Sequence, residues 1–278
     1  MKPRVMSLVI FTCAVGLLTS PVSVPYYKSI ISIFFVAVGA GAAGALNMWY
    51  EADLDKLMTR TCLRPIPTGK LNKNQALIFG IVLSLLSIVG LYYSSNLLSA
   101  VILFITISFY VFIYTIWLKR KTPQNIVIGG ASGALPPVIG WTIANNNLAL
   151  EPITLFLIIF FWTPSHFWAL SLYKSDDYKK ANIPMLPLTN GVESTKINIF
   201  VYSLLMLPVI IFPYLINFVG LVFLIPSLLL TFYYNFLCYE LYNYKKNKFD
   251  PKKAKSIFGY SILYLFLIFV LFLIDKIL

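Results

Sequence analysis

Nine apolar runs of about 20 residues follow one another along this chain, and a run of that length spans a bilayer as one α-helix. We predict membrane spans near residues 5–23, 30–48, 75–94, 97–118, 124–144, 153–172, 197–215, 219–242 and 256–274. Only 12% of the 278 residues are charged, which is too few for the surface of a soluble protein of this size. We therefore predict an all-α, polytopic membrane protein with one domain over residues 1–278. The first run follows Lys2 and Arg4, so a signal peptide is the alternative interpretation there.

The basic residues alternate from loop to loop. Of the 22 Lys and Arg residues, 20 lie in the N-terminal tail or in the loops after the second, fourth, sixth and eighth runs, and the others are Lys28 and Lys276. Cytoplasmic loops carry such an excess, so we predict a cytoplasmic N-terminus and an external C-terminus. The same distribution explains the net charge of +12 as a topology signal rather than as a sign of nucleic-acid binding.

A polar stretch, NMWYEADLD, follows the second run directly. Because no Pro or Gly interrupts residues 45–64, we expect the helix to continue, which would stack Asn47, Glu51 and Asp55 on one face. Oxygen-bearing side chains in that arrangement can share Mg²⁺, whose coordination is usually completed by substrate phosphates. Arg60 and Arg64 could bind the same phosphates.

The alternative is that this stretch is only a solvated helix end. Three physical arguments favour a functional site instead. Like charges four residues apart repel each other, carboxylates at the C-terminal end of a helix face its negative pole, and ionisable groups beside a bilayer are costly unless they are used.

A second acidic pair, Asp176 and Asp177, follows the sixth run. By itself it would be an ordinary loop pair, but it reaches the same membrane face as the first cluster, so we predict that both gather around metal. Lys119 and Arg120 end the fourth run. They either anchor that span to lipid head groups or clamp a diphosphate.

Other polar or small residues inside the runs each allow two interpretations. Gly129 and Gly133 form a GxxxG motif, which either permits close helix packing or leaves room for a large flat ligand. The same alternatives hold for the second run, at Gly39, Gly41 and Gly44. Pro136 and Pro137 should kink the fifth span. His166 is either a hydrogen-bonded interior side chain or a haem ligand or acid–base group.

Five strings of the sequence together resemble the haem-modifying branch of the UbiA-type intramembrane prenyltransferases. They are NMWYEADLD, RPIPTGK, YTIWLKRKTPQNIVIGGASGALPPVIGW, WTPSHFWAL and DYKKANIPMLP, and the similarity extends from about Lys2 to Gly191. The resemblance implies a nine-helix bundle around a central cavity that opens to the lipid bilayer of the cell inner membrane. It implies transfer of the farnesyl group of farnesyl diphosphate to a vinyl group of haem B, with Mg²⁺ as cofactor. It also suggests a link to haem A synthase or to terminal oxidase assembly.

The resemblance also implies roles for individual residues. It makes Asn47, Glu51, Asp55 and Asp177 catalytic and metal-binding, with Asp176 as a further metal ligand. It gives diphosphate binding to Arg60 and Arg64. From the residues themselves we add Lys119, Arg120 and Lys174 as diphosphate-binding candidates, and His166, alone inside a span, as the haem-binding candidate. The second acidic motif departs from the family pattern, because Tyr173 stands where a carboxylate four residues before Asp177 is usual.

Three other functions fit the membrane topology. The first is a prenyltransferase of the same architecture that alkylates a quinone precursor. The second is a transporter, although its charged sites would be expected at mid-bilayer on broken helices. The third is a structural subunit for haem-protein assembly, which would need no ladder of carboxylates.

Overall fold

The computed structural model describes the backbone of residues 3–59 and 61–278, and the side chains of residues 6–59 and 61–278. These ranges are all-helical, and eight helical stretches in them are long and apolar enough to cross a membrane. They are α2 (Tyr26–Tyr50), α4 (Lys73–Ser94), α5 (Leu97–Ser108) with the π-helix η1 (Phe109–Leu118), α6 (Asn125–Ala134) with α7 (Pro136–Asn145), α8 (Leu150–Tyr173), α11 (Gly191–Leu215), α12 (Leu221–Tyr242) and α13 (Pro251–Ile277). The prediction of an all-α, multi-pass membrane protein is confirmed.

The first predicted span is shorter than expected. Helix α1 covers Pro3–Leu18, only 16 residues. The hydroxyl of Thr19 donates a 2.8 Å hydrogen bond to the carbonyl of Val15, and Pro21 follows shortly after. Because a proline cannot continue the hydrogen-bond ladder of a helix, the helix ends before the apolar run does.

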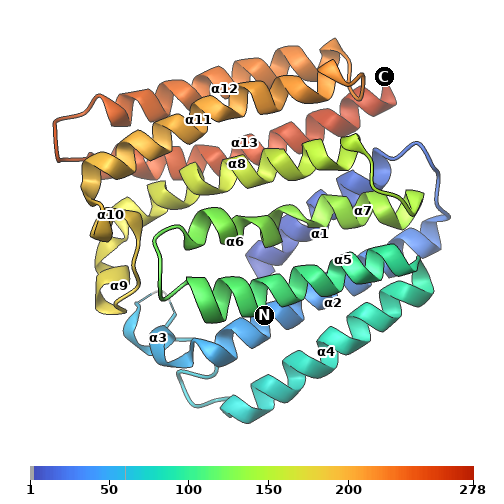
Figure 1. Ribbon diagram of the computed structural model, residues 1–278, viewed down its shortest axis with the longest axis horizontal. Coiled ribbons are helices and arrows are strands. Elements are labelled where there is room, and N and C mark those ends of the chain that lie inside the picture. Colours follow the sequence, from blue (N-terminus) through green and yellow to red (C-terminus); the bar gives the residue numbers. More distant parts are fainter. Residues whose placement is uncertain (1–2, 60) are drawn as a thin grey trace.

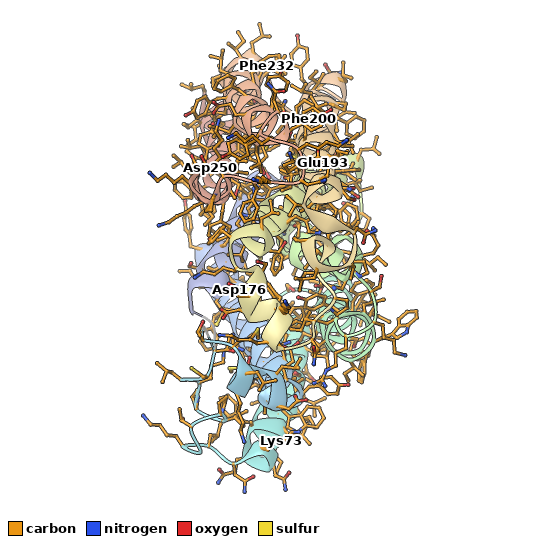
Figure 2. The ribbon with its side chains drawn as sticks, turned by 90° about the vertical axis from the view of Figure 1, so that its left-hand side faces the viewer. Lys73, Asp176, Glu193, Phe200, Phe232 and Asp250 are labelled. Carbon is orange, nitrogen blue, oxygen red and sulfur yellow. The ribbon has the colours of Figure 1, made fainter. Side chains whose placement is uncertain are left out.

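The long helices lie side by side along the long axis of the molecule, and three short helices gather at one end (Figure 1). These are α3 (Ala52–Leu57), α9 (Ser175–Lys180) and α10 (Leu186–Thr189). The loops after α2, η1, α8 and α12 reach the same end, and they are the loops that carry most of the basic residues. We call it the basic end. Figure 2 looks onto it, with Lys73, Asp176, Glu193 and Asp250 facing the viewer.

Helices α1 and α7 cross in direct backbone contact. A Cβ atom on Gly140 would overlap the carbonyl oxygen of Cys13, and one on Gly16 would overlap the carbonyl oxygen of Pro137. Small residues permit this approach in a membrane, where packing rather than the hydrophobic effect holds helices together. The crossing fixes α1 against the half of the fifth span that follows its kink.

Two of the spans are interrupted. The fifth span breaks at Leu135, between α6 and α7, with Pro136 as the first residue of α7, so the predicted proline kink is confirmed. The expectation of one continuous helix through residues 45–64 is wrong, because α2 ends at Tyr50 and Glu51 (φ −92°, ψ 13°) separates it from α3. Tertiary contacts of α3 explain the break. The change of direction at Glu51 lets Leu54 and Met58 pack in a separate apolar cluster at the basic end.

Candidate functional site

The three oxygen-bearing residues of the first motif remain on consecutive turns despite the helix break. The amide of Glu51 donates to the carbonyl of Asn47 (3.0 Å), and the amide of Asp55 donates to the carbonyl of Glu51 (2.8 Å). All three side chains are buried, at 0%, 2% and 0% exposure for Asn47, Glu51 and Asp55. The structure therefore contains the predicted row of oxygen-bearing side chains, which we call the acidic ladder (Asn47, Glu51 and Asp55). It is covered by protein rather than by solvent.

Asn47 is held against the π-helix. Its side-chain amide donates to the hydroxyl of Thr115 (3.1 Å), which in turn donates to the carbonyl of Tyr110 (2.8 Å). A π-helical turn leaves carbonyls displaced from their usual α-helical partners, and such turns frequently occur at functional sites. Thr115 satisfies one of these carbonyls and at the same time ties η1 to α2, which fixes the first rung of the ladder.

Glu51 pairs with Lys119, the first residue after η1. The Nζ atom of Lys119 lies 2.7 Å from Oε2, in hydrogen-bond geometry, and 2.6 Å from Oε1. The Lys119 side chain is only 12% exposed. Oε1 is buried and receives no directed hydrogen bond from the residues that the structure describes. The Oε1 atom of Glu51 therefore interacts with the Lys119 ammonium group by charge, without a directed hydrogen bond.

Asp55 pairs with Arg64. The guanidinium Nη1 lies 2.8 Å from Oδ1 and 2.7 Å from Oδ2, and the aspartate is fully buried. The hydroxyl of Thr61 donates to the backbone carbonyl of Asp55 (3.0 Å), so the loop after α3 folds back over the last rung. The sequence prediction that Arg64 lies beside the ladder is consistent with this contact. The companion residue Arg60 lies outside the described residues.

Among the described residues, Asp177 is the member of the second acidic motif that contacts the loop after α3. Asp177 accepts hydrogen bonds from the hydroxyl of Thr59, at 2.8 and 2.9 Å. Asp176 is exposed on α9 (Figure 2), and Lys174 is exposed with its Nζ 6.0 Å from the ring of Tyr173. The structure therefore brings Asp177 to the loop after α3 but leaves Asp176 and Lys174 away from the ladder.

An apolar cluster holds the two motifs together. Leu54 and Met58 of the first motif pack with Ile126 of α6 and with Tyr178, next to Asp177, and the other members are Ala181, Ile183 and Met185. This cluster therefore joins α3, α6 and the α9 region at the basic end.

The residues present fit a hard divalent cation at the ladder. Asn47, Glu51 and Asp55 supply oxygen atoms, which are the ligands that Mg²⁺ prefers, and the buried Oε1 of Glu51 lacks a directed partner. The described residues nevertheless contain no group of three or more His, Cys, Asp or Glu side chains close enough to share a metal ion. Lys119 and Arg64 neutralise the carboxylates instead, so metal shared between the two motifs stays a prediction.

Arg120 has a different partner from the predicted one. Its guanidinium forks onto Asp53 at 2.8 and 3.0 Å and lies 5.1 Å from the ring centre of Tyr50. Burial raises the pKa of the Asp53 carboxyl, but the hydrogen bond and charge of Arg120 outweigh this and lower it below the usual 3.8. Asp53 was not predicted as a site residue. Asp53 is two residues from both Glu51 and Asp55, so it does not lie on the helix face of the ladder. Its contact with Arg120 instead connects α3 to the end of η1.

His166 is clamped between aromatic rings on α8. Its ring stacks on Trp162 (centroids 4.2 Å apart, planes at 19°) and on Phe258 of α13 (4.7 Å, 25°). Its Nδ1 lies 2.6 Å from the hydroxyl oxygen of Ser261, also on α13. The histidine is therefore a hydrogen-bonded interior side chain, and this arrangement also leaves its second ring nitrogen available to a ligand.

The glycines divide between the two predicted uses. A Cβ on Gly129 would overlap the ring of Tyr114, and one on Gly130 would lie 3.1 Å from Thr163, so both serve close packing. Gly44 is different, because it is buried and yet a Cβ there would meet no atom of the described residues within 4 Å. Gly44 lies seven residues before Glu51 and so on the same helix face. The helix face that carries the acidic ladder therefore borders free space about two turns before Glu51 on α2.

Comparison with known proteins agrees with this architecture. The model of the UbiA prenyltransferase family matches residues 8–273. The chain is 78% identical over 278 residues to a protein of Pelagibacter ubique called protoheme IX farnesyltransferase, covering 100% of this chain and 92% of that one. It is 50% identical over 277 residues to protoheme IX farnesyltransferase 2 of Mesorhizobium japonicum, covering 100% and 88%.

Solved structures share the fold at low sequence identity. A digeranylgeranylglyceryl phosphate synthase superposes with a TM-score of 0.82 at 18% identity, covering 99% of this chain and 95% of that one. A UbiA homologue from Archaeoglobus fulgidus bound to DMAPP and Mg²⁺ gives a TM-score of 0.72 at 14% identity, covering 97% and 96%. At these identities the likeness concerns the arrangement of the helices.

Proposed function

The chain belongs to the UbiA prenyltransferase family, and we propose that it transfers the farnesyl group of farnesyl diphosphate to a vinyl group of haem B, giving haem O and diphosphate. The observation that carries this proposal is the end-to-end similarity to farnesyltransferases that act on protohaem IX. The structure supports it with a buried ladder of acids and bases at one end of an apolar helix bundle.

We place the diphosphate at the basic end, against the acidic ladder. Lys119 and Arg64 are the described bases that touch the ladder carboxylates, so they are the groups that can move from carboxylate to phosphate oxygens. Arg120 stays with Asp53 and keeps α3 in place. Asn47, Glu51, Asp55 and Asp177 are the residues that would hold Mg²⁺. When bound, the ion neutralises charge that builds up on the leaving diphosphate.

The apolar interior serves the alkylation step. The C1–O bond of farnesyl diphosphate breaks, its electrons pass to the diphosphate, and C1 forms a bond with a haem vinyl carbon. Water then adds to the resulting carbocation and releases one proton to solvent, which leaves a neutral hydroxyl group on the product. We assign the stabilisation of positive charge on the farnesyl group, by cation–π contact, to the rings of Tyr110 and Tyr114, which are 5.4 Å apart on η1, with Lys119 Nζ 5.6 Å from the Tyr114 ring. The burial of Asn47, Glu51 and Asp55, at 0%, 2% and 0% exposure, supports a site that bulk water does not reach.

The distribution of basic residues supports a location of this chemistry at the cytoplasmic face of the inner membrane. The basic end carries the loops predicted to be cytoplasmic, and the acidic ladder lies at that end. Farnesyl diphosphate can then enter from the cytoplasm and haem from the bilayer. The product, haem O, would pass to a haem A synthase or a terminal oxidase. Charged residues at one end, rather than at mid-bilayer, favour this function over a transporter.

The test uses the purified full-length protein in lipid nanodiscs with haem B, farnesyl diphosphate and Mg²⁺, with the pigment analysed by mass spectrometry. We expect haem O from the wild type and no turnover from Glu51→Gln or Asp55→Asn. Glu240→Gln is the matched control, because this carboxylate forms an exposed pair with Lys253 between α12 and α13, away from α3 and the ladder.

Two results would contradict the assignment. Near-normal turnover in Glu51→Gln or Asp55→Asn, with Glu240→Gln equally active, would remove the ladder from the mechanism. Alkylation of a quinone precursor such as a hydroxybenzoate, with haem B left unchanged, would make the protein a prenyltransferase for a different acceptor.

A further inference from the structure

Residues on α8 and α13 form a second polar site, separate from the acidic ladder. His166 and Ser261 are 95 positions apart, and their side chains meet at 2.6 Å inside the bundle. The indole of Trp162 donates to the backbone carbonyl of Ser261 (2.8 Å). Three groups that are polar and expensive in a membrane interior thus converge on one point, which is unusual without a functional reason.

The hydrogen bonds assign the tautomer of His166. Ser261 has one hydroxyl hydrogen, and its oxygen lies 2.7 Å from the carbonyl of Phe258, a group that can only accept. The serine therefore donates to that carbonyl and accepts from the imidazole, so that Nδ1 of the neutral ring carries the hydrogen. Nε2 is left with its lone pair.

Nε2 has no acceptor among the residues that the structure describes, and it is not one of their buried unpartnered atoms, so it lies at the accessible part of the ring. With Nδ1–H donating to Ser261, the neutral imidazole presents the lone pair of Nε2 on that side.

The position of the ring on α8 directs it toward the inside of the bundle. Thr163 packs against Gly130 of α6, whereas Trp162 bonds to α13. His166 is three and four residues beyond these two, so it lies on the face of α8 between α6 and α13. It is partly accessible and is seven residues from Tyr173, the last residue of α8, or about 10 Å inside that end.

We infer that His166 Nε2 ligates the iron of the haem substrate and that Ser261 is the positioning residue that keeps this nitrogen free and aimed. Histidines that bind metals generally donate their other N–H to a fixed acceptor, which sets the tautomer and the ring direction. Here Ser261 is that acceptor, and the stacking of Trp162 and Phe258 restrains both faces of the ring. The C-terminal helix α13 thereby takes part in substrate recognition.

This inference rests on the proposed function, because it requires haem as a substrate. The experiment titrates ferric haem B, without farnesyl diphosphate, into the full-length protein in nanodiscs and follows the Soret band and the EPR spectrum. We expect the wild type to show a histidine-ligated haem. His166→Gly should lose that signature, and added imidazole should restore it by occupying the vacated position.

The serine variants test the positioning role. Ser261→Ala removes only the acceptor for Nδ1, since Trp162 bonds to the backbone carbonyl, and we expect haem affinity to fall about 10- to 100-fold. Ser261→Thr keeps a hydroxyl and should rescue binding. Ser171→Ala is the control, because this buried serine on α8 donates to the carbonyl of Trp168 in its own helix.

The outcomes separate the inference from the proposed function. A wild type that converts haem B to haem O, with a haem spectrum unchanged by His166→Gly, would refute the ligand assignment and leave the reaction standing. A loss of affinity in Ser171→Ala equal to that in Ser261→Ala would refute the positioning role. A wild type that neither binds nor converts haem would refute the function itself.

Discussion

Replacing Lys119 by Met should expose how the ladder is held before substrate binds. Lys119 neutralises Glu51 at 2.6–2.7 Å, and the two side chains are 12% and 2% exposed. Methionine fills a similar volume but leaves a carboxylate buried without a counter-charge. Breaking a buried pair in this way costs about 3–5 kcal/mol of stability.

The matched control is Lys253→Met, which removes the same charge from a different pair. Lys253 lies 3.0 Å from Glu240, and their side chains are 32% and 39% exposed. Exposed pairs of this kind contribute about 0.2–1 kcal/mol. The difference in burial alone therefore predicts a several-fold larger loss at Lys119 than at Lys253.

Thermal unfolding of the full-length protein in nanodiscs, with and without Mg²⁺, provides the assay. Lys119→Met should lower Tm far more than Lys253→Met, and Mg²⁺ should recover part of the loss in Lys119→Met because the unpaired carboxylate then binds the cation. Equal Tm losses in the two variants would refute the reasoning about burial. A large loss that Mg²⁺ leaves untouched would refute the metal assignment at Glu51.

Three further predictions follow from contacts described above. Gly140→Leu should destabilise the fold by about 1–3 kcal/mol in thermal unfolding, because any side chain there overlaps the backbone of α1. The control Gly259→Ala should be neutral or slightly stabilising, because a Cβ at Gly259 meets no described atom within 4 Å. Thr59→Val removes both hydrogen bonds to Asp177, so trypsin should cut the α9 region faster while the Tm changes little; an unchanged cleavage rate would show that the apolar cluster alone holds α9. The pKa of Asp53 is lowered in the folded protein, so its ionised carboxylate contributes to the free energy of unfolding above pH 3.8, and this contribution is lost as the pH falls below that value. The difference in Tm between the wild type and Asp53→Asn should therefore shrink on acidification.

The sequence was sufficient to predict the 8 spans that the described residues contain, but not the shorter first helix, and it predicted the helix face shared by Asn47, Glu51 and Asp55. Apolar run length predicts a membrane helix almost independently of context, and four-residue spacing predicts a shared face whenever the segment is helical. Asn47, Glu51 and Asp55 accordingly lie on consecutive turns, as expected. Their roles in catalysis and metal binding remain predictions.

The partners of these residues could not be predicted, because they come from distant parts of the chain. Asp53 and Arg120 are 67 positions apart, and Thr59 and Asp177 are 118 apart. The helix break at Glu51 has the same origin. No local signal such as Gly or Pro marks it, and the packing of α3 on residues of α6 and α9 accounts for it.

The two acid–base pairs of the ladder differ in when they can form during biosynthesis. Asp55 and Arg64 are 9 positions apart and leave the ribosome together, whereas Lys119 follows Glu51 by 68 positions. At a translation rate of 5–20 residues per second, Glu51 waits about 3–14 s for its counter-ion. The two pairs therefore cannot form at the same stage of synthesis, because the counter-ion of Glu51 is made only after the fourth predicted span.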